Sequence, residues 1–350
     1  MQNPVQNETP VVFDVSPFSP AGAVERELRD YFDLTNEMIK ELEPTASALE
    51  YEAYVAELRR PLTYRGPRAC WVARSGGRIV GSAEVTFLEH ENDRFAQISV
   101  RVTRRLRRNG VGRALLVACL AAARGAGREV VVGYNLEDDS AGLEWARGLG
   151  FAVVKRTVWQ TLDVAATDSA LWRVCLDESF RLERWVDIAP ESLVAGFAAA
   201  RTAIEDAPAG ESSVHAPNWT VERVRGYEAE LKEIGEEHWY IVAVSAETGE
   251  VAGFTEIAFD PSLPATCFQE DTAVLARYRG RGLGRAVKAE MMQWLRANRP
   301  NISEVRTTTS ADNVPMIRVN EQLGYVTTAM LHAVEIGAAE LDRRLRESES

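Results

Sequence analysis

The stretch from Val274 to Trp294 reads Val-Leu-Ala-Arg-Tyr-Arg-Gly-Arg-Gly-Leu-Gly-Arg-Ala-Val-Lys-Ala-Glu-Met-Met-Gln-Trp, which is typical of a strand end, a short glycine loop and a helix. Glycine lacks a Cβ, so Gly280, Gly282 and Gly284 let the backbone adopt left-handed conformations and bring its N–H groups close to a ligand. The apolar residues that follow recur at helical spacing, which predicts a helix with one face on a sheet. Since a helix N-terminus presents unpaired N–H groups and a positive dipole end, the stretch predicts a pyrophosphate site.

Two common phosphate-binding loops are excluded by the spacing of these glycines. The loop of nucleoside triphosphatases requires Gly-x-x-x-x-Gly-Lys-Ser/Thr, and no such lysine follows here. The dinucleotide loop requires Gly-x-Gly-x-x-Gly, whereas this loop reads Gly-x-Gly-x-Gly. Arg279, Arg281 and Arg285 add positive charge to the same turn.

The motif Arg279-x-x-Gly282-x-Gly284 is similar to the Arg/Gln-x-x-Gly-x-Gly/Ala motif of the GCN5-related N-acetyltransferase (GNAT) superfamily. Two flanking segments resemble the same family. Residues 251–256 resemble its central hairpin, and residues 313–325 resemble its closing helix and Leu-Gly-Phe/Tyr turn. The resemblance covers most of the second half of the chain, in the family's order.

The first half of the chain repeats this pattern. The loop Arg107-Arg-Asn-Gly110-Val-Gly112 precedes an apolar run, and Leu-Gly-Phe closes the segment at residues 149–151. The offset from Glu84 to Glu256 is 256 − 84 = 172, and from Gly110 to Gly282 it is 282 − 110 = 172. The constant offset indicates two copies of one fold in tandem.

The resemblance implies an α+β fold of two tandem GNAT-like domains, each a mixed, mostly antiparallel sheet flanked by helices. We expect a leader over residues 1–20 that is drawn into the fold, an N-terminal domain over 21–165 and a C-terminal domain over 166–350. The alternating strand at 153–164 is expected to close the first sheet, and the strand at 326–336 is expected to be the last of the second.

Composition bounds the class of protein. The 350 residues suit two domains of about 150 residues each, and a formal net charge of −12 argues against a nucleic-acid partner. No apolar stretch approaches the roughly 18 residues that a membrane span requires. The four cysteines contain no Cys-x-x-Cys pair, so neither a metal site nor a disulfide framework is predicted. We expect a cytoplasmic protein that is a monomer or a homodimer.

Acetyl-CoA is the cofactor that the resemblance implies. In the family, the backbone at the end of the strand meets the pantetheine and the thioester carbonyl, and the loop binds the pyrophosphate. The resemblance also assigns a coenzyme A contact to an asparagine at the start of the closing helix, where a helix cap is the alternative. The predicted cofactor-binding residues are Val274, Leu275, Ala276, Arg279, Gly280, Arg281, Gly282, Leu283, Gly284, Arg285, Asn313 and Asn320.

Acetyl transfer to an amine requires a general base, because an alkylamine with a pKa of about 10 is mostly protonated at neutral pH. Glu270, on the strand that leads to the loop, is one candidate, although the family's usual position falls nearer Phe268. Glu256, on the neighbouring strand, is the other candidate, and a solvated carboxylate is the alternative for each. Many members of the family carry a tyrosine that acts as the general acid. At its position this chain has Asn320 in the second half and Ala146 in the first.

The two halves differ at the base position. The offset places Ile98 where the second half has Glu270, since 270 − 172 = 98, and isoleucine cannot accept a proton. We therefore expect an N-acetyltransferase that acts on a small-molecule amine, with a catalytic C-terminal domain and a degenerate N-terminal one. A mycothiol-synthase-like acetyltransferase and a non-catalytic acyl-CoA-binding protein remain as alternatives.

Overall fold

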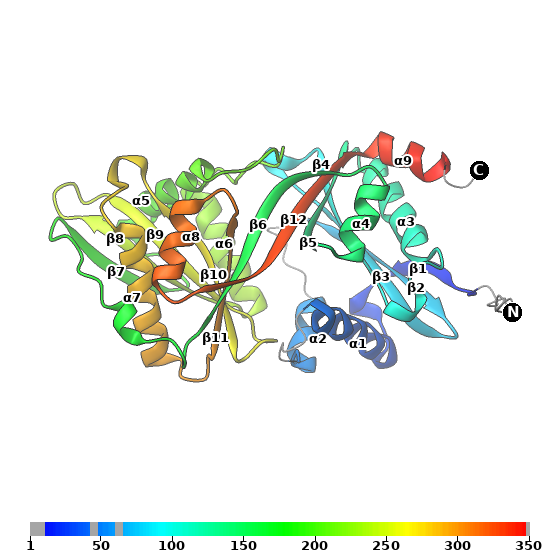
Figure 1. The fold of residues 1–350 in the computed structure, drawn as a ribbon, viewed down its shortest axis with the longest axis horizontal. Helices are drawn as coiled ribbons and strands as arrows, with labels where there is room; N and C mark the ends of the chain where they lie inside the picture. The colour runs from blue at the N-terminus through cyan, green and yellow to red at the C-terminus, as the bar shows by residue number, and fades with distance from the viewer. Residues whose placement is uncertain (1–10, 43–47, 60–65, 348–350) are drawn as a thin grey trace, which may run out of the picture.

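The computed structural model describes residues 11–42, 48–59 and 66–347, and its strands form one continuous sheet (Figure 1). The first half contains β1 (Asp14–Phe18), α1 (Glu25–Leu42), α2 (Tyr51–Arg59), β2 (Arg68–Ser75), β3 (Arg78–Phe87), β4 (Phe95–Val102), α3 (Val111–Gly125), β5 (Val130–Glu137), α4 (Ala141–Gly148) and β6 (Ala152–Asp163). The second half contains β7 (Phe180–Val186), α5 (Glu191–Thr202), α6 (Val221–Ile234), β8 (Glu237–Ser245), β9 (Val251–Phe259), β10 (Thr266–Val274), α7 (Leu283–Asn298), β11 (Glu304–Ser310), α8 (Val314–Gln322), β12 (Val326–Gly337) and α9 (Ala338–Glu347).

The sheet confirms the predicted α+β class. Its strand order is β1-β2-β3-β4-β5-β12-β6-β11-β10-β9-β8-β7, and all neighbours are antiparallel except the pairs β4–β5 and β10–β11. We call β1–β5 with β12 the first lobe and β7–β11 with β6 the second lobe. The first lobe contains the parallel pair β4–β5, and the second lobe contains the parallel pair β10–β11. Part of the expected leader forms the edge strand β1, which pairs with β2, while residues 1–10 lie outside the described residues.

The last strand of each half is exchanged between the lobes, so the expectation that residues 153–164 close the first sheet is wrong. β12 pairs with β5 from Leu331↔Glu137 to Gly337↔Val130, and it separates β5 from β6. β6 instead pairs with β11 along its other edge, from Asp163↔Glu304 to Thr157↔Ser310. Figure 1 shows β6 and β12 side by side, spanning the two lobes. The expected domain boundary at residue 165 therefore marks the end of the first sequence repeat, but it does not separate two sheets.

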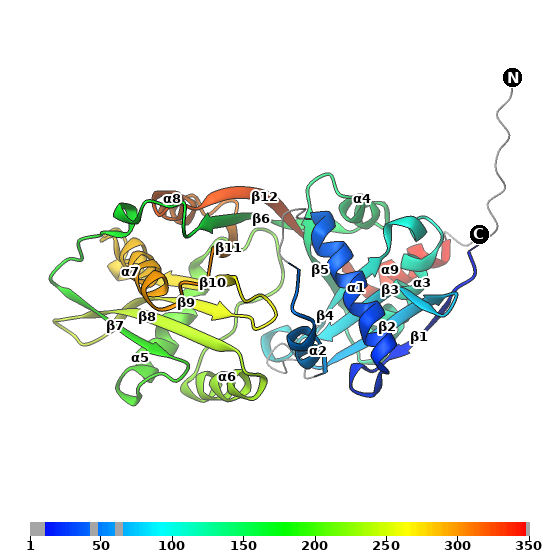
Figure 2. The same ribbon diagram turned by 90° about the horizontal axis from the view of Figure 1, so that it is seen from below.

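Helices cover both faces of the sheet in the second lobe. α7 packs on β8 and β9 through the buried Val287, Met291 and Leu295, which confirms the apolar face predicted from their spacing. α5 packs on the opposite face of β9, with α6 beside it (Figure 2). Burying each such aliphatic side chain contributes about 1.5–3 kcal/mol to folding.

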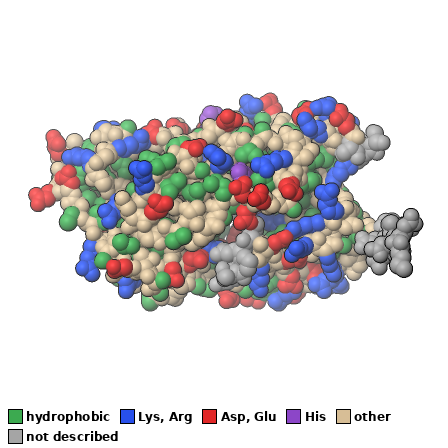
Figure 3. Space-filling view, in the orientation of Figure 1, with side chains coloured by type: hydrophobic (Ala, Val, Ile, Leu, Met, Phe, Trp, Pro, Cys, Tyr) green, Lys and Arg blue, Asp and Glu red, His purple; other side chains and the backbone are tan. Residues whose placement is uncertain are grey.

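The surface carries both signs of charge. On the face seen in Figure 3, Lys and Arg side chains are interspersed with Asp and Glu. In the described part of the chain, no helix combines the length and the apolar character that a membrane span requires.

The strand exchange predicts that the two halves of the chain cannot fold separately. A fragment of residues 1–165 lacks β12 and α9, whose Ile336, Leu341 and Leu345 are buried in the first lobe's core. Its β5 edge would also be unpaired. We expect fragment 1–165 alone to aggregate or remain unfolded, and a mixture with fragment 166–350 to give a folded 1:1 complex. Size-exclusion chromatography with circular dichroism measures this, and a folded, monomeric fragment 1–165 would contradict it.

Candidate active site

Both predicted glycine loops lead into helix N-termini through left-handed residues. In the second lobe, Gly280 has a φ of 76° and Gly282, the N-cap of α7, has a φ of 75°. In the first lobe, Gly110 caps α3 with a φ of 83°, and Arg108 adopts a φ of 66° at the position of Gly280. The two loops therefore share a backbone path, although an arginine in the left-handed region is disfavoured relative to glycine.

The second loop keeps one arginine without an anionic partner. Arg279 donates to the carbonyl of Val274 and pairs with Asp206 at 2.5 Å, and Arg281 lies 3.4 Å from Asp177. The half-buried Arg285, in the first turn of α7, has no ion pair among the described residues, and its Nε atom is buried without a hydrogen-bond partner. A helix N-terminus with an unpaired guanidinium is a favourable environment for a phosphate group.

The first loop is instead occupied by the protein's own side chains. Glu37 of α1 accepts hydrogen bonds from the Thr103 hydroxyl at 2.8 Å and from the backbone N–H of Arg104 at 3.0 Å. Glu41 holds the guanidinium of Arg107 through both carboxylate oxygens. Arg113, at the position of Arg285, donates to the carbonyl of Leu345 in α9. Glu37 therefore places negative charge beside residues 103–104, just before the loop, and Arg113 has a partner that Arg285 lacks. The Arg107–Glu41 pair has a counterpart in the second lobe, the Arg279–Asp206 pair.

The parallel strands β10 and β11 separate beside the second loop. They pair only from Thr266↔Glu304 to Gln269↔Thr307, although β10 continues to Val274. At the same point the register between β9 and β10 shifts, because Ile257 pairs with Gln269 and Thr255 pairs with Thr272. A one-residue β-bulge of this kind bends the strand and redirects its side chains. The bulge therefore bends β10 at the point where it leaves β11.

The bulge is absent from the equivalent pair in the first lobe. β3 and β4 keep one register, with Ile98 opposite Val85 and Ser99 opposite Glu84. In the second lobe the two residues Glu270 and Asp271 together lie opposite Glu256. The constant offset therefore misplaced one position: Gln269, and not Glu270, is the structural counterpart of Ile98.

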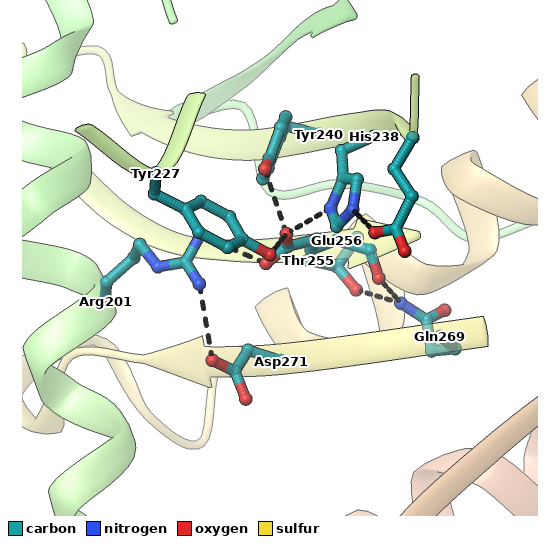
Figure 4. Close-up of polar contacts among 9 residues, drawn as sticks. Arg201, Tyr227, His238, Tyr240, Thr255, Glu256, Gln269 and Asp271 are labelled. Atoms are coloured by element: carbon teal, nitrogen blue, oxygen red, sulfur yellow. Dashed lines mark hydrogen bonds and ion pairs between the residues drawn. The ribbon is translucent and has the colours of Figure 1, made fainter. Parts of the chain in front are cut away.

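A buried ionic cluster lies on the α5/α6 face of the sheet, next to the bulge (Figure 4). Glu256 is 1% exposed, and its carboxylate contacts Arg201 at 3.1 Å and His238 at 2.7 Å. It also accepts hydrogen bonds from the hydroxyls of Tyr240 at 2.9 Å and Tyr227 at 3.4 Å. The negative charge of Glu256 is therefore fully compensated inside the core.

These contacts set the protonation states of the cluster. Burial alone would raise the pKa of Glu256, but Arg201, His238 and Tyr240 hold it at about 2. Burial alone would lower the pKa of His238, but its hydrogen bonds to Glu236 and Glu256 raise it to about 9. At neutral pH, Glu256 is a carboxylate and His238 is an imidazolium. A carboxylate with so low a pKa is a weak acceptor for a substrate proton.

The two carboxylates of the bulge have different surroundings. Glu270 is exposed. The Asp271 side chain is 39% exposed and lies 3.7 Å from Arg201. Burial among the neighbouring groups raises the pKa of Asp271, Arg201 opposes this, and the charge of Glu256 adds to it. Asp271 therefore combines access to solvent with an increased proton affinity.

Sequence reasoning missed Arg201, His238, Tyr240 and Asp271. Arg201 lies on α5, and His238 and Tyr240 lie two residues apart on β8, but neither segment carries a motif that identifies them. Asp271 is adjacent to the predicted Glu270, but counting alternate residues cannot find it, because the bulge changes which face each residue takes.

The other predicted cofactor residues are distributed around the opening. Val274 ends β10, and Leu275 and Ala276 follow it toward the glycine loop. Asn313 is the N-cap of α8 and accepts a hydrogen bond from the N–H of Met316. This is the helix cap that was given as the alternative to a coenzyme A contact. Asn320 is 1% exposed and donates to Gln160 of β6 at 2.7 Å. A contact of either asparagine with a cofactor remains a prediction.

Comparisons with known proteins agree with the fold. The model of the acetyltransferase (GNAT) family matches residues 30–153 and 211–325. A tandem GNAT protein from the clavulanic acid biosynthesis pathway is similar in structure, with a TM-score of 0.78, 23% identity, and coverage of 93% of this chain and 99% of that one. A GCN5-related N-acetyltransferase from Sphaerobacter thermophilus has a TM-score of 0.68 and 15% identity, with 93% and 96% coverage. At these identities the likeness shows the fold alone.

A third similar structure is a glucosamine N-acetyltransferase region of a fungal multi-domain β-N-acetylglucosaminidase. It has a TM-score of 0.66 and 16% identity, with coverage of 94% of this chain and 38% of that one. No curated protein matches the chain.

The ionic cluster predicts a pH-dependent stability. The pKa of His238 rises from 6.5 to about 9 on folding, so between these values the folded state holds a proton that the unfolded chain releases. The contribution of His238 to the free energy of unfolding is therefore largest below pH 6.5 and falls as the pH rises through about 9, by on the order of 3 kcal/mol. The buried Lys288 acts in the opposite direction, because burial lowers its pKa to about 7 and stability is gained as the pH rises above that value. Urea unfolding of the wild type and of His238→Gln at pH 6, 7.5 and 9 measures, by difference, the slope that His238 adds.

His238→Gln should reduce that slope, because the titrating group is then absent. His215→Gln, which removes an exposed histidine outside the cluster, serves as the control and should keep the slope. Equal slopes in the wild type and His238→Gln would show that the cluster does not hold the proton.

Proposed function

The chain belongs to the acetyltransferase (GNAT) family, and we propose that it moves an acetyl group from acetyl-CoA to an amine of a small molecule, with catalysis in the second lobe. The observation that carries this proposal is the combination, in that lobe alone among the described residues, of an unpaired Arg285 at a helix N-terminus and a β-bulge in the strand that precedes it. The parting of the parallel strands is common to both lobes, since β4 and β5 pair only from Phe95↔Val130 to Gln97↔Val132.

The residues present fit acetyl-CoA. The N–H groups around Gly282 and Gly284, with the guanidinium of Arg285, would hold the pyrophosphate. The backbone from Val274 to Ala276 would lie along the pantetheine arm. When bound, acetyl-CoA supplies an activated thioester. The space at Gly284 suits a close approach, since an added Cβ would meet only Val274 Cγ2 at 3.8 Å in the absence of a ligand.

The base that we propose is a carboxylate of the bulge. Glu256 is a weaker candidate, because the cluster holds its pKa at about 2. Asp271 has a raised pKa and a partly exposed side chain, so it is the stronger candidate for accepting the proton of an amine, and Glu270 is the alternative. Arg201 and Glu256 form a buried ion pair beside Asp271, so their charges are already in place when that proton is transferred.

The first lobe is proposed to be a structural copy. Glu37 and Glu41 contact its loop, Arg113 is bound by α9, and Ile98 and Ser99 offer no carboxylate at the base position. An anionic cofactor would have to displace these carboxylates at an electrostatic cost.

A non-catalytic acyl-CoA-binding protein is the second candidate function. It is favoured by Asn320 and Ala146, which stand where many relatives carry a tyrosine acid. A mycothiol-synthase-like acetyltransferase is an enzymatic alternative. Steady release of thiol from acetyl-CoA in the presence of an amine pool supports an enzyme, whereas binding without release supports the non-catalytic candidate.

The lobe assignment predicts opposite outcomes for one substitution made in two places. Gly284→Asp sets a negative charge against the pyrophosphate site and should abolish acetyl transfer and the thermal stabilisation by acetyl-CoA. Gly112→Asp is the matched control and should retain both. For a ligand at about 100 times its Kd, the stabilisation lost is about 2.7 kcal/mol.

Neither aspartate should prevent folding, because an added Cβ at Gly112 or Gly284 meets no atom closer than 3.6 Å. Differential scanning fluorimetry with and without acetyl-CoA, together with a thiol-release assay, measures both effects. An inactive Gly112→Asp beside an active Gly284→Asp would place catalysis in the first lobe.

The base assignment predicts a change in the pH–rate profile. Asp271→Asn should reduce kcat/KM by about 100-fold or more at neutral pH, where the amine is mostly protonated, and less at high pH. Glu270→Gln is the matched variant one residue away and should have the smaller effect. If Glu270→Gln shows the larger loss and Asp271→Asn keeps the wild-type profile, the base is Glu270.

A further inference from the structure

Gln269 carries a buried amide at the point where β10 and β11 separate. Gln269 is 3% exposed. Its Nε2 atom donates to the Thr255 hydroxyl and to the backbone carbonyl of Glu256, both at 2.7 Å (Figure 4). Its Oε1 atom is buried and has no donor among the described residues. An unsatisfied buried acceptor of this kind costs about 1–3 kcal/mol.

The orientation of this amide follows from its partners. The carbonyl of Glu256 can only accept a hydrogen bond, so the nitrogen of Gln269 must face it. Rotating the amide would bring two oxygens together and is excluded. The orphaned atom is therefore an acceptor, and a ligand that satisfies it must supply a donor.

Gln269 lies on the face of the sheet that α7 covers. Its partner Thr255 is opposite Ile241 of β8, and Ile241 packs in one core with Val287 of α7. Asp271 and the ionic cluster lie on the opposite face, under α5 and α6. The orphaned oxygen thus shares a face with the α7 N-terminus, and the proposed base does not.

Gln269 is also the last residue of β10 that pairs with β11. The Thr307 hydroxyl donates to its backbone carbonyl at 2.8 Å, and beyond this pair the two strands part. At the same position the first lobe has Ile98, which offers no acceptor. β4 and β5 of the first lobe also part, after Gln97↔Val132, so the polar side chain and not the opening distinguishes the second lobe.

We propose that Gln269 Oε1 accepts a hydrogen bond from an amide N–H of the pantetheine arm of coenzyme A, in the opening between β10 and β11. This assignment rests on the proposed function. The arm carries two amide N–H donors, and it would run on the α7 face from the pyrophosphate site toward the narrow end of the opening. Gln269 is a binding residue in this assignment and takes no part in proton transfer.

The test compares two ligands that differ only in the arm. Isothermal titration measures the Kd of coenzyme A and of 3′-phosphoadenosine 5′-diphosphate, which has the pyrophosphate but no pantetheine. Gln269→Met keeps the side-chain volume and removes the acceptor. It should raise the Kd of coenzyme A by about 3- to 10-fold, the range for one neutral hydrogen bond, and leave the Kd of the shorter ligand unchanged.

Gln97→Met is the matched control. Gln97 is a partly buried glutamine of β4, next to Ile98 in the first lobe, and no cofactor contact is assigned to it. It should bind both ligands like the wild type. If Gln269→Met does not fold, Gln269→Asn replaces it, since the shorter side chain keeps the amide but withdraws its oxygen.

A variant at Gln269 that binds coenzyme A like the wild type would overturn the assignment and leave the proposed function intact. An equal loss of affinity for both ligands would also overturn it, because the effect would then be structural. A wild-type protein that binds neither ligand would overturn the proposed function, and this assignment with it.

Discussion

The pairing of β6 with β11 is the constraint on which the second lobe depends. β11 is a strand of seven residues, and all seven pair with β6, whereas only four pair with β10. Because one edge of β11 is satisfied along its whole length, its other edge can leave β10 after Thr307 without leaving the strand unsupported. The opening beside the glycine loop therefore depends on a strand from the other half of the chain, and β12 performs the reciprocal role for β5.

The two lobes show that a shared backbone does not imply a shared site. Both loops enter their helices through left-handed residues, and Arg108 follows the path of Gly280 despite the cost of that conformation. What differs is the chemistry brought to the loop. The first arginine of each loop has a carboxylate partner, Glu41 for Arg107 and Asp206 for Arg279. The arginine in the first turn of the helix differs, because Arg113 donates to the carbonyl of Leu345, whereas Arg285 has no partner among the described residues. The absence of a bulge in β4 also leaves its side chains in regular alternation.

Local sequence patterns predicted the parts of the fold that are local. The glycine loop, the apolar face of α7 and the repeat at offset 172 depend on residues close in sequence or on a direct comparison of segments. The exchange of β6 and β12 could not be predicted in this way, since alternation shows that a strand has two faces but not which edge it pairs with. The bulge could not be predicted for a related reason. Counting alternate residues assumes a regular strand, so it assigned Glu270 to one face of the sheet and did not identify Asp271.

The ionic cluster connects the bulge to the proposed chemistry. A fully buried Glu256 would be costly alone, and it is tolerated because Arg201, His238 and two tyrosine hydroxyls satisfy its oxygens. With its own carboxylate saturated, the cluster cannot readily take a proton, but its charges act on the neighbouring strand. Burial raises the pKa of Asp271, Arg201 opposes that rise, and the negative charge of Glu256 adds to it. A carboxylate whose pKa is raised in this way is a better proton acceptor than Glu256, whose pKa is held at about 2. On this argument Glu256, one of the two residues that the sequence indicated as a base, would act through its charge on Asp271, which the sequence did not indicate.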